Sequence, residues 1–170
     1  EEGKMNSYMF FYENGNFYET KKFQNGILNG LSKMYYEDGI VSKEVNYLNG
    51  KFHGEGKFYY KNGNVSVLQN FDNGKSIDAI YYFENGKKKS ITNYTNEMKN
   101  GINQEFYENG KLKTEANYLN GKLHGKFVEY DENGNKKSEK NYNNGNLEYR
   151  TDGIYVFNCR KFLSKNEYYY

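Results

Sequence analysis

Apolar and polar residues alternate along most of the chain, in short runs separated by turn residues. Between Leu31 and Tyr47, the runs LSKMYY and IVSKEVNY flank the tripeptide EDG, and the second run has apolar residues at alternate positions. A period of two predicts a β-strand with one buried face, and Asp-Gly between two such runs predicts a hairpin turn. We therefore expect strands and turns over nearly the whole chain, and no helix.

The predicted hairpin recurs with a fixed period. Glycines of x-Asn/Asp-Gly turns lie 23 or 24 residues apart, and an aromatic residue with the same spacing leads into a second turn, which is Asn-Gly in five of six units and contains Glu97 in the fourth. The turn glycines are Gly15, Gly39, Gly63, Gly86, Gly110 and Gly134, and the aromatic residues are Phe23, Tyr47, Phe71, Tyr94, Tyr118 and Tyr142. A period in the twenties indicates stacked repeats in which each unit packs mainly on its neighbours.

Two geometries are compatible with the first turn, and they place different side chains beside Val45 and Tyr47. A two-residue type I′ loop would bring Tyr36 and its counterparts to that face, whereas a three-residue loop with a left-handed glycine would bring Tyr35 and its counterparts there. The Tyr35 position is aromatic in all six units, but the Tyr36 position is occupied by Asp131 in the last. We therefore favour the three-residue loop.

That loop predicts a second set of apolar side chains on the other face of the sheet. A single layer has no further layer to cover them, so they are either exposed or covered by a partner. This candidate binding strip consists of Phe10, Tyr12, Met34, Tyr36, Phe58, Tyr60, Tyr81 and Phe83. The strip fades towards the end of the array, where Glu105, Glu129 and Asp131 take its positions.

The two histidines belong to the repeat. His53 and His124 occupy the same position of the second and fifth units, three periods apart. We expect a structural role for them in the inter-hairpin turn, because no nearby cluster of Asp, Glu or Cys completes a metal shell or an acid–base site. The sequence contains no catalytic or cofactor-binding motif, so we expect no enzyme, no metal and no cofactor.

Composition and charge narrow the classes of partner. Aromatic residues make up 19% of the chain without any Trp, so Phe and Tyr supply most of the apolar surface. The net charge is +2, from 24 basic and 22 acidic residues that are interspersed, and no basic groove for nucleic acid is indicated. No apolar run approaches the roughly 18 residues of a membrane span. Because the chain begins with Glu1 and not Met, a leader removed by processing or by design of the expressed chain is conceivable, and we favour a secreted or cell-surface location over the cytoplasm.

The period breaks after Tyr149. The remaining stretch contains one more turn, at Asp152-Gly153, and an apolar strand, Ile154 to Phe157. Terminal repeats need a modified outer edge that prevents strand addition by other molecules, so we interpret 150–170 as a C-terminal capping segment and 8–149 as the six repeats. Cys159, the only cysteine, lies in this segment; it excludes an intrachain disulfide and is expected to be a small packing residue.

The repeated residues resemble a known family. The segment from Asn49 to Gly56, NGKFHGEG, followed by Tyr59 and Asn62-Gly63, is similar to the MORN repeat, specifically to the bacterial MORN-variant form found in some toxin–antitoxin-associated proteins; a second copy, NGKLHG, begins at Asn120. The resemblance covers residues 8–149. It implies an elongated, twisted sheet of successive hairpins that attaches to membranes, phospholipids or proteins, including copies of the same chain.

Taken with the resemblance, the pattern predicts an all-β fold: an elongated single-layer twisted antiparallel sheet of six hairpin repeats with a C-terminal cap. The function that we expect is that of a non-catalytic scaffold, which mediates protein–protein interaction or self-association, a homodimer included, through the aromatic strip. The alternative is a module that contacts a membrane surface, phospholipid or glycan, since Tyr and Lys side by side suit both headgroups and sugar rings.

Overall fold

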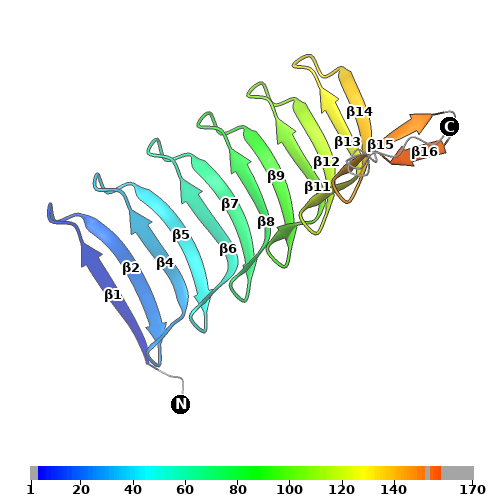
Figure 1. The fold of residues 1–170 in the computed structure, drawn as a ribbon. Coiled ribbons are helices and arrows are strands. Elements are labelled where there is room, and N and C mark those ends of the chain that lie inside the picture. Colours follow the sequence, from blue (N-terminus) through cyan, green and yellow to red (C-terminus); the bar gives the residue numbers. More distant parts are fainter. Residues whose placement is uncertain (1–3, 152–153, 158–170) are drawn as a thin grey trace, which may run out of the picture.

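The chain forms one open antiparallel sheet. The computed structural model describes residues 4–151 and 154–157, and in that part of the chain it contains strands and turns but no helix. Figure 1 shows a long, curved, single layer. Its strands are β1 (Met5–Phe11), β2 (Phe17–Gln24), β3 (Ile27–Leu28), β4 (Gly30–Tyr35), β5 (Val41–Leu48), β6 (Lys51–Tyr59), β7 (Val65–Asp72), β8 (Lys75–Tyr82), β9 (Lys88–Thr95), β10 (Met98–Lys99), β11 (Gly101–Phe106), β12 (Leu112–Leu119), β13 (Lys122–Tyr130), β14 (Lys136–Asn143), β15 (Asn146–Thr151) and β16 (Ile154–Phe157).

The long strands follow one another across the sheet in chain order, so neighbouring strands are also neighbours in sequence. The short strands β3 and β10 pair only with β2 and β9, beside the turns between units. Hairpin loops lie along one edge of the layer and the inter-unit turns along the other (Figure 1). The predicted all-β, single-layer hairpin array is therefore confirmed. The boundary between repeats and cap stays a prediction, and Cys159 lies outside the described residues.

The hairpin loops have the predicted three-residue form. In the second unit the Tyr36 amide donates to the Ile40 carbonyl at 2.8 Å, and the Gly39 amide donates to the Tyr36 carbonyl at 2.9 Å. Gly39 has a φ of 88°, a left-handed conformation that favours glycine. The inter-unit turns are two-residue loops in which both residues have positive φ, such as Asn49 at 51° and Gly50 at 79°.

The predicted assignment of side chains to faces is wrong, because each hairpin contains a second irregularity. Tyr35 pairs with Val41 but Met34 pairs with Lys43, so Ser42 is an extra residue, and the same one-residue bulge recurs in all six hairpins. A shift of one residue exchanges the two faces of a strand. Met34 therefore shares a face with Val45, which we call the Val45 face, and Tyr35 lies on the other, the Glu44 face.

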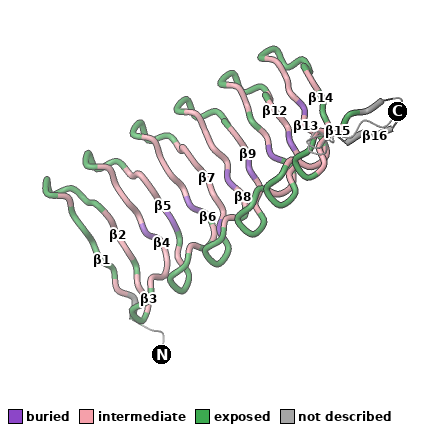
Figure 2. The backbone as a smooth tube through the Cα atoms, in the orientation of Figure 1, coloured by how far each residue is buried: buried purple, intermediate pink, exposed green. Residues whose placement is uncertain are grey.

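The core is a thin band across the middle of the strands (Figure 2). On the Val45 face it is built from small side chains, because a single curved layer covers its own surface only where neighbouring rings reach over small residues. The buried residues of this face are Ser32, Val45, Phe71, Ala79, Thr92, Asn103 and Ala116. A Cβ added at Gly56 would lie 3.0 Å from Val45 Cγ1 and 3.1 Å from Phe71 Cε2. Glycine therefore allows the close contact there.

Candidate functional site

The structure divides the predicted strip into two sets of residues with different roles. The first set, which we call the strip row, consists of Phe10, Met34, Phe58 and Tyr81. Strand pairing places these residues in one line across the Val45 face, in the order Phe10, Glu19, Met34, Lys43, Phe58, Val67, Tyr81. Strands lie about 4.8 Å apart, so the line is roughly 30 Å long. The strip row is thus brought together, although on the opposite face to the one predicted.

The second set consists of the residues that enter the hairpin loops, and the structure gives three of them a role in stacking the units. Tyr12 Oη donates a hydrogen bond to the Tyr35 carbonyl at 2.7 Å. The same bond recurs from Tyr36 to Tyr59 and from Tyr60 to Tyr82, each also at 2.7 Å, and from Tyr107 to Tyr130 at 2.9 Å. We call this series the tyrosine ladder. Phe83 occupies its fourth position and has no hydroxyl group to donate.

Lysine side chains lie against the aromatic rings of both sets. Lys21 Nζ lies 5.5 Å from the centroid of the Phe10 ring, and Lys43 Nζ lies 4.9 Å from that of Phe52 and 5.5 Å from that of Phe58. Cations at this distance are attracted to the ring face. Burial lowers the pKa of Lys43, which is consistent with its place between Met34 and Phe58. The rings are therefore partly covered by the aliphatic stems of these lysines.

Exposure falls along the strip row. Phe10 is 45% exposed, whereas Met34, Phe58 and Tyr81 are half-buried. At the first hairpin Tyr8, on the same face as Phe10, is also exposed, whereas the exposed Met9 and Phe11 lie on the Glu44 face. The Val45 face thus presents an apolar surface that decreases from the first hairpin towards the fourth, and Glu105 and Glu129 then continue the line.

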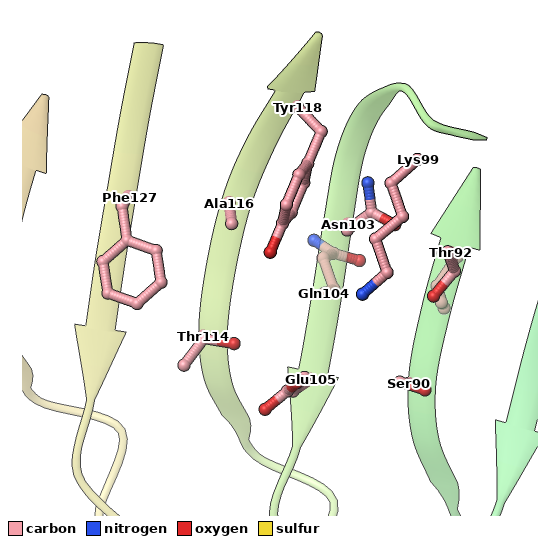
Figure 3. A pocket seen from close by; sticks show the side chains of 11 residues that line it. Ser90, Thr92, Lys99, Asn103, Gln104, Glu105, Thr114, Ala116, Tyr118 and Phe127 are labelled. Atoms are coloured by element: carbon pink, nitrogen blue, oxygen red, sulfur yellow. The ribbon is translucent and has the colours of Figure 1, made fainter. Parts of the chain in front are cut away.

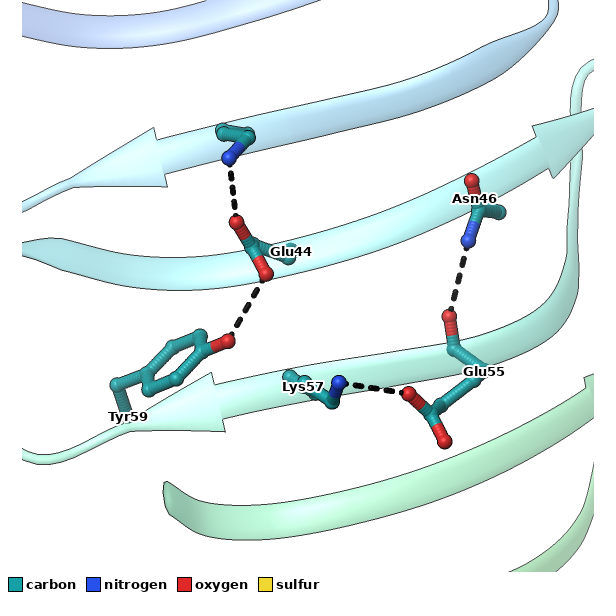
Figure 4. Close-up of polar contacts among 6 residues, drawn as sticks. Glu44, Asn46, Glu55, Lys57 and Tyr59 are labelled. Atoms are coloured by element: carbon teal, nitrogen blue, oxygen red, sulfur yellow. Dashed lines mark hydrogen bonds and ion pairs between the residues drawn. The ribbon is translucent and has the colours of Figure 1, made fainter. Parts of the chain in front are cut away.

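The Glu44 face carries a polar network over the same hairpins (Figure 4). Glu44 accepts contacts from Lys33 Nζ at 2.6 Å and from Tyr59 Oη at 2.9 Å, and Lys57 Nζ pairs with Glu55 at 2.9 Å. The bond from Lys33 lowers the pKa of Glu44, while burial and the Glu44 carboxylate raise the pKa of Tyr59 to about 12. These charged and polar groups therefore satisfy one another.

A hollow of about 240 Å³ interrupts the Val45 face at β9, β11 and β12 (Figure 3), and we call it the β9–β12 hollow. Its floor contains Thr92, Asn103 and Ala116. Around the floor, Figure 3 shows Lys99 and Tyr118 on one side and Glu105 on the other, with Phe127 on a neighbouring strand. Burial raises the pKa of Tyr118, and the nearby Glu105 carboxylate adds to this effect. Sequence analysis missed this hollow, although Lys99 replaces a residue that is apolar in most units.

The histidines occupy the inter-unit side of the strands, as the repeat predicts. His53 Nδ1 lies 3.5 Å from an Asp72 carboxylate oxygen, and His124 Nδ1 is buried without a hydrogen-bond partner among the described residues. The residues that the structure describes contain no group of three His, Cys, Asp or Glu side chains able to hold a metal ion. No helix long and apolar enough to cross a membrane occurs among them.

Comparison with protein families agrees with the hairpin period. The model for the MORN repeat variant matches residues 28–49, 77–96, 99–120 and 123–144, and the model for the MORN repeat matches residues 46–65. The matched segments cover more than half of the chain and follow the inter-unit turns. No curated protein matches the chain. Four variant repeats in register with hairpins of the structure, together with one standard repeat, show that the chain belongs to the MORN-repeat family.

Proposed function

We propose that this protein is a non-catalytic interaction module that binds protein, in the first place a second copy of itself, through the strip row on the Val45 face. Repeats of this family generally bind proteins or membranes, and the family is not one of enzymes. The observation that supports the proposal is that Phe10, Met34, Phe58 and Tyr81 lie on alternate strands of one line, on a face that no second layer of described residues covers.

The charges within the line favour a second copy as the partner. Glu19 and Lys43 flank Met34 on its two sides. A two-fold axis through Met34 would place Glu19 of one molecule opposite Lys43 of the other, as an isologous interface requires. The small net charge of +2 opposes such an approach only weakly.

The size of the line sets the expected affinity. With a length of roughly 30 Å and a width of about 10 Å, it covers on the order of 300 Å². Stable complexes bury about 800 Å² per partner. We therefore expect a weak and concentration-dependent dimer, unless Tyr8, which is exposed on the same face of the first hairpin, adds to the interface.

The proposal is tested by sedimentation equilibrium over a wide range of protein concentration. The variant Met34→Thr/Phe58→Thr removes two members of the strip row and puts in their place a β-branched residue that suits a strand. The control Leu68→Thr/Ile80→Thr makes a similar change in a cross-strand pair on the Glu44 face. We expect association of the parent protein and the control, and a monomer for the strip variant.

Three results would contradict the proposal. The first is that the parent protein is monomeric at all concentrations. The second is that a folded strip variant associates as the parent does, and the third is that the strip variant and the control lose association equally. Liposome flotation with the same three proteins tests the membrane alternative, which the lysines beside Phe10 and Phe58 favour. Binding of the monomeric parent to liposomes, lost in the strip variant, would replace the protein-binding proposal by the membrane one.

A further inference from the structure

The β9–β12 hollow lies where the fourth and fifth units depart from the residues that close the same surface around Phe52 of the second unit. In the second unit the Phe52 ring lies 4.9 Å from that of Tyr47 and 5.1 Å from that of Phe71, so aromatic rings lie together over this part of the strands. The residue at the Phe52 position is Leu in three other units, Ser76 in the third and Lys99 in the fourth. An aromatic cover is thereby replaced by a flexible stem with a charged end.

A second departure lies across the hollow. Glu105 takes the position that Met34, Phe58 and Tyr81 occupy in earlier units. Glu129 takes it again in the following unit, but Glu129 accepts a hydrogen bond from Ser138 Oγ at 2.6 Å and lies 3.8 Å from Lys140 Nζ. Within residues 4–151 and 154–157, Glu105 makes no ion pair and no side-chain hydrogen bond. The same holds for Lys99, whose Nζ lies only against the Tyr118 ring, 5.3 Å from its centroid.

The lining between these two charges is suited to a small polar molecule. The floor offers the Thr92 hydroxyl and the Asn103 amide, which are both more than nine-tenths buried. The Asn103 side chain already bonds the backbone, through Oδ1 to the Asn93 amide and through Nδ2 to the Gly101 carbonyl, so it is held in a fixed orientation. Tyr118 and Phe127 add aromatic surface at the side. A concave site with a few convergent polar groups and an aromatic wall is typical of small-ligand sites.

We propose that the β9–β12 hollow binds a small zwitterion, with the anionic group at Lys99 and the ammonium group at Glu105. Lys99 and Glu105 are both exposed, so water hydrates their charges; a zwitterion replaces this water with a charge-assisted bond to each side chain, whereas a ligand with one charge bonds only one of them. The Tyr118 ring also attracts a ligand cation. This chemistry is present in a free α-amino acid and in a phosphoethanolamine group, and the two sources are separated by experiment. The inference is independent of the strip row.

Binding is measured by calorimetry and by amide chemical shifts of the ¹⁵N-labelled protein. The probes are l-phenylalanine and phosphoethanolamine. N-acetyl-l-phenylalanine amide and glucose, which carry no charge, serve as controls. We expect saturable shifts at Thr92, Asn103 and Ala116 with one or both zwitterions. The two probes distinguish an amino acid from a headgroup, because the probe that matches the natural ligand saturates the shifts at a lower concentration than the other.

Two variants and one matched control test the assigned charges. Lys99→Leu restores the residue of most other units, and Glu105→Gln removes the charge without changing the shape. Each is expected to weaken binding at least about tenfold, the factor for losing about 1.4 kcal/mol from one charged contact. Glu129→Gln changes the same repeat position of the next unit and should leave binding unchanged. If Lys99→Leu does not fold, Lys99→Gln replaces it as the variant that removes the charge.

The proposal is overturned if neither zwitterion gives saturable shifts at these amides, or if the uncharged amide or glucose binds as tightly. It is also overturned if folded Lys99 and Glu105 variants bind as the parent does. The Met34→Thr/Phe58→Thr variant should retain full binding of the zwitterion. Failure of the strip proposal and failure of this one therefore give different results.

Discussion

Removing one hydroxyl group from the tyrosine ladder should loosen the contact between two successive units. In Tyr36→Phe the ring stays in place and only the hydrogen bond to the Tyr59 carbonyl is lost. The bond is 2.7 Å long, part-buried, and connects residues 23 positions apart. Unlike the strand pairing within a hairpin, it joins one hairpin loop to the next unit, so its loss weakens an inter-unit interface.

The expected loss follows from the chemistry of the bond. A neutral hydrogen bond contributes a net 0.5–1.5 kcal/mol, and an acceptor left unpaired in a part-buried site adds to the cost of deletion, so we expect about 1 kcal/mol. The double variant Tyr36→Phe/Tyr60→Phe acts on two successive interfaces and should lose about 2 kcal/mol if these act independently. In the opposite direction, Phe83→Tyr offers the missing hydroxyl to the Phe106 carbonyl, the counterpart of Tyr82, and should stabilise the protein by up to about 1 kcal/mol.

Urea unfolding followed by circular dichroism measures these differences. The matched control is Tyr35→Phe, because the Tyr35 hydroxyl makes no hydrogen bond in the described part of the chain while its ring is similarly half-buried. If Tyr35→Phe costs as much as Tyr36→Phe, or if neither ladder variant shifts the midpoint, the hydroxyl groups do not stabilise the stacking of units.

Three further changes test the turns and the polar network. Glu97, at a φ of 63° where the other units have glycine, should gain about 1 kcal/mol of unfolding free energy on change to Gly, measured by urea unfolding; an unchanged or lower stability would contradict the assigned backbone strain. Gly63→Val, at a φ of 84°, should lose roughly 1–3 kcal/mol, and an unshifted melting temperature would show that this turn is not as described. Lys33 lowers the pKa of Glu44, so the parent should lose stability relative to Glu44→Gln as pH falls below about 4.3, the range in which an unfolded glutamate protonates. Lys33 has a raised pKa, so the same pair weakens again only at strongly alkaline pH; a difference between parent and variant that is constant from pH 7 to pH 3 would exclude the ion pair as its source.

The sequence predicts the hairpin array well because each turn requires a particular residue type. Positive φ at Gly39 and at Asn49-Gly50 leaves a mark that recurs every 23 or 24 residues, and the three-residue loop follows from the aromatic column at Tyr35. The loop prediction is nevertheless correct for a wrong reason, because the Tyr35 column does not share the face of Val45. Period and turn chemistry are local properties, and they determine the order of the strands when every unit pairs with the next.

The faces of the sheet could not be predicted in the same way. The bulged position is Ser42 in the second unit, Ser66 in the third and Lys89 in the fourth, so no residue type marks the bulge, although it exchanges the two faces. The tyrosine ladder could not be predicted either. The sequence shows a recurring aromatic residue at Tyr12 and Tyr36, but it does not show whether the hydroxyl group is free or bonded to the next unit. The β9–β12 hollow depends on residues from β9, β11 and β12 that come together only through pairing, and Lys99 alone marks it in the sequence.

The self-association proposal is tested most directly by intermolecular contacts at Met34, through which the proposed two-fold axis passes. Protein carrying a ¹³C-labelled Met methyl group is mixed with unlabelled protein, and isotope-filtered nuclear Overhauser effects between the two are recorded at a concentration where sedimentation shows a dimer. We predict effects between the labelled Met34 methyl protons of one molecule and the unlabelled Met34 methyl protons of the other, since a two-fold axis through Met34 places the two Met34 side chains opposite one another. A dimer in which Met34 shows no intermolecular effect would contradict the assignment of the strip row as the binding surface.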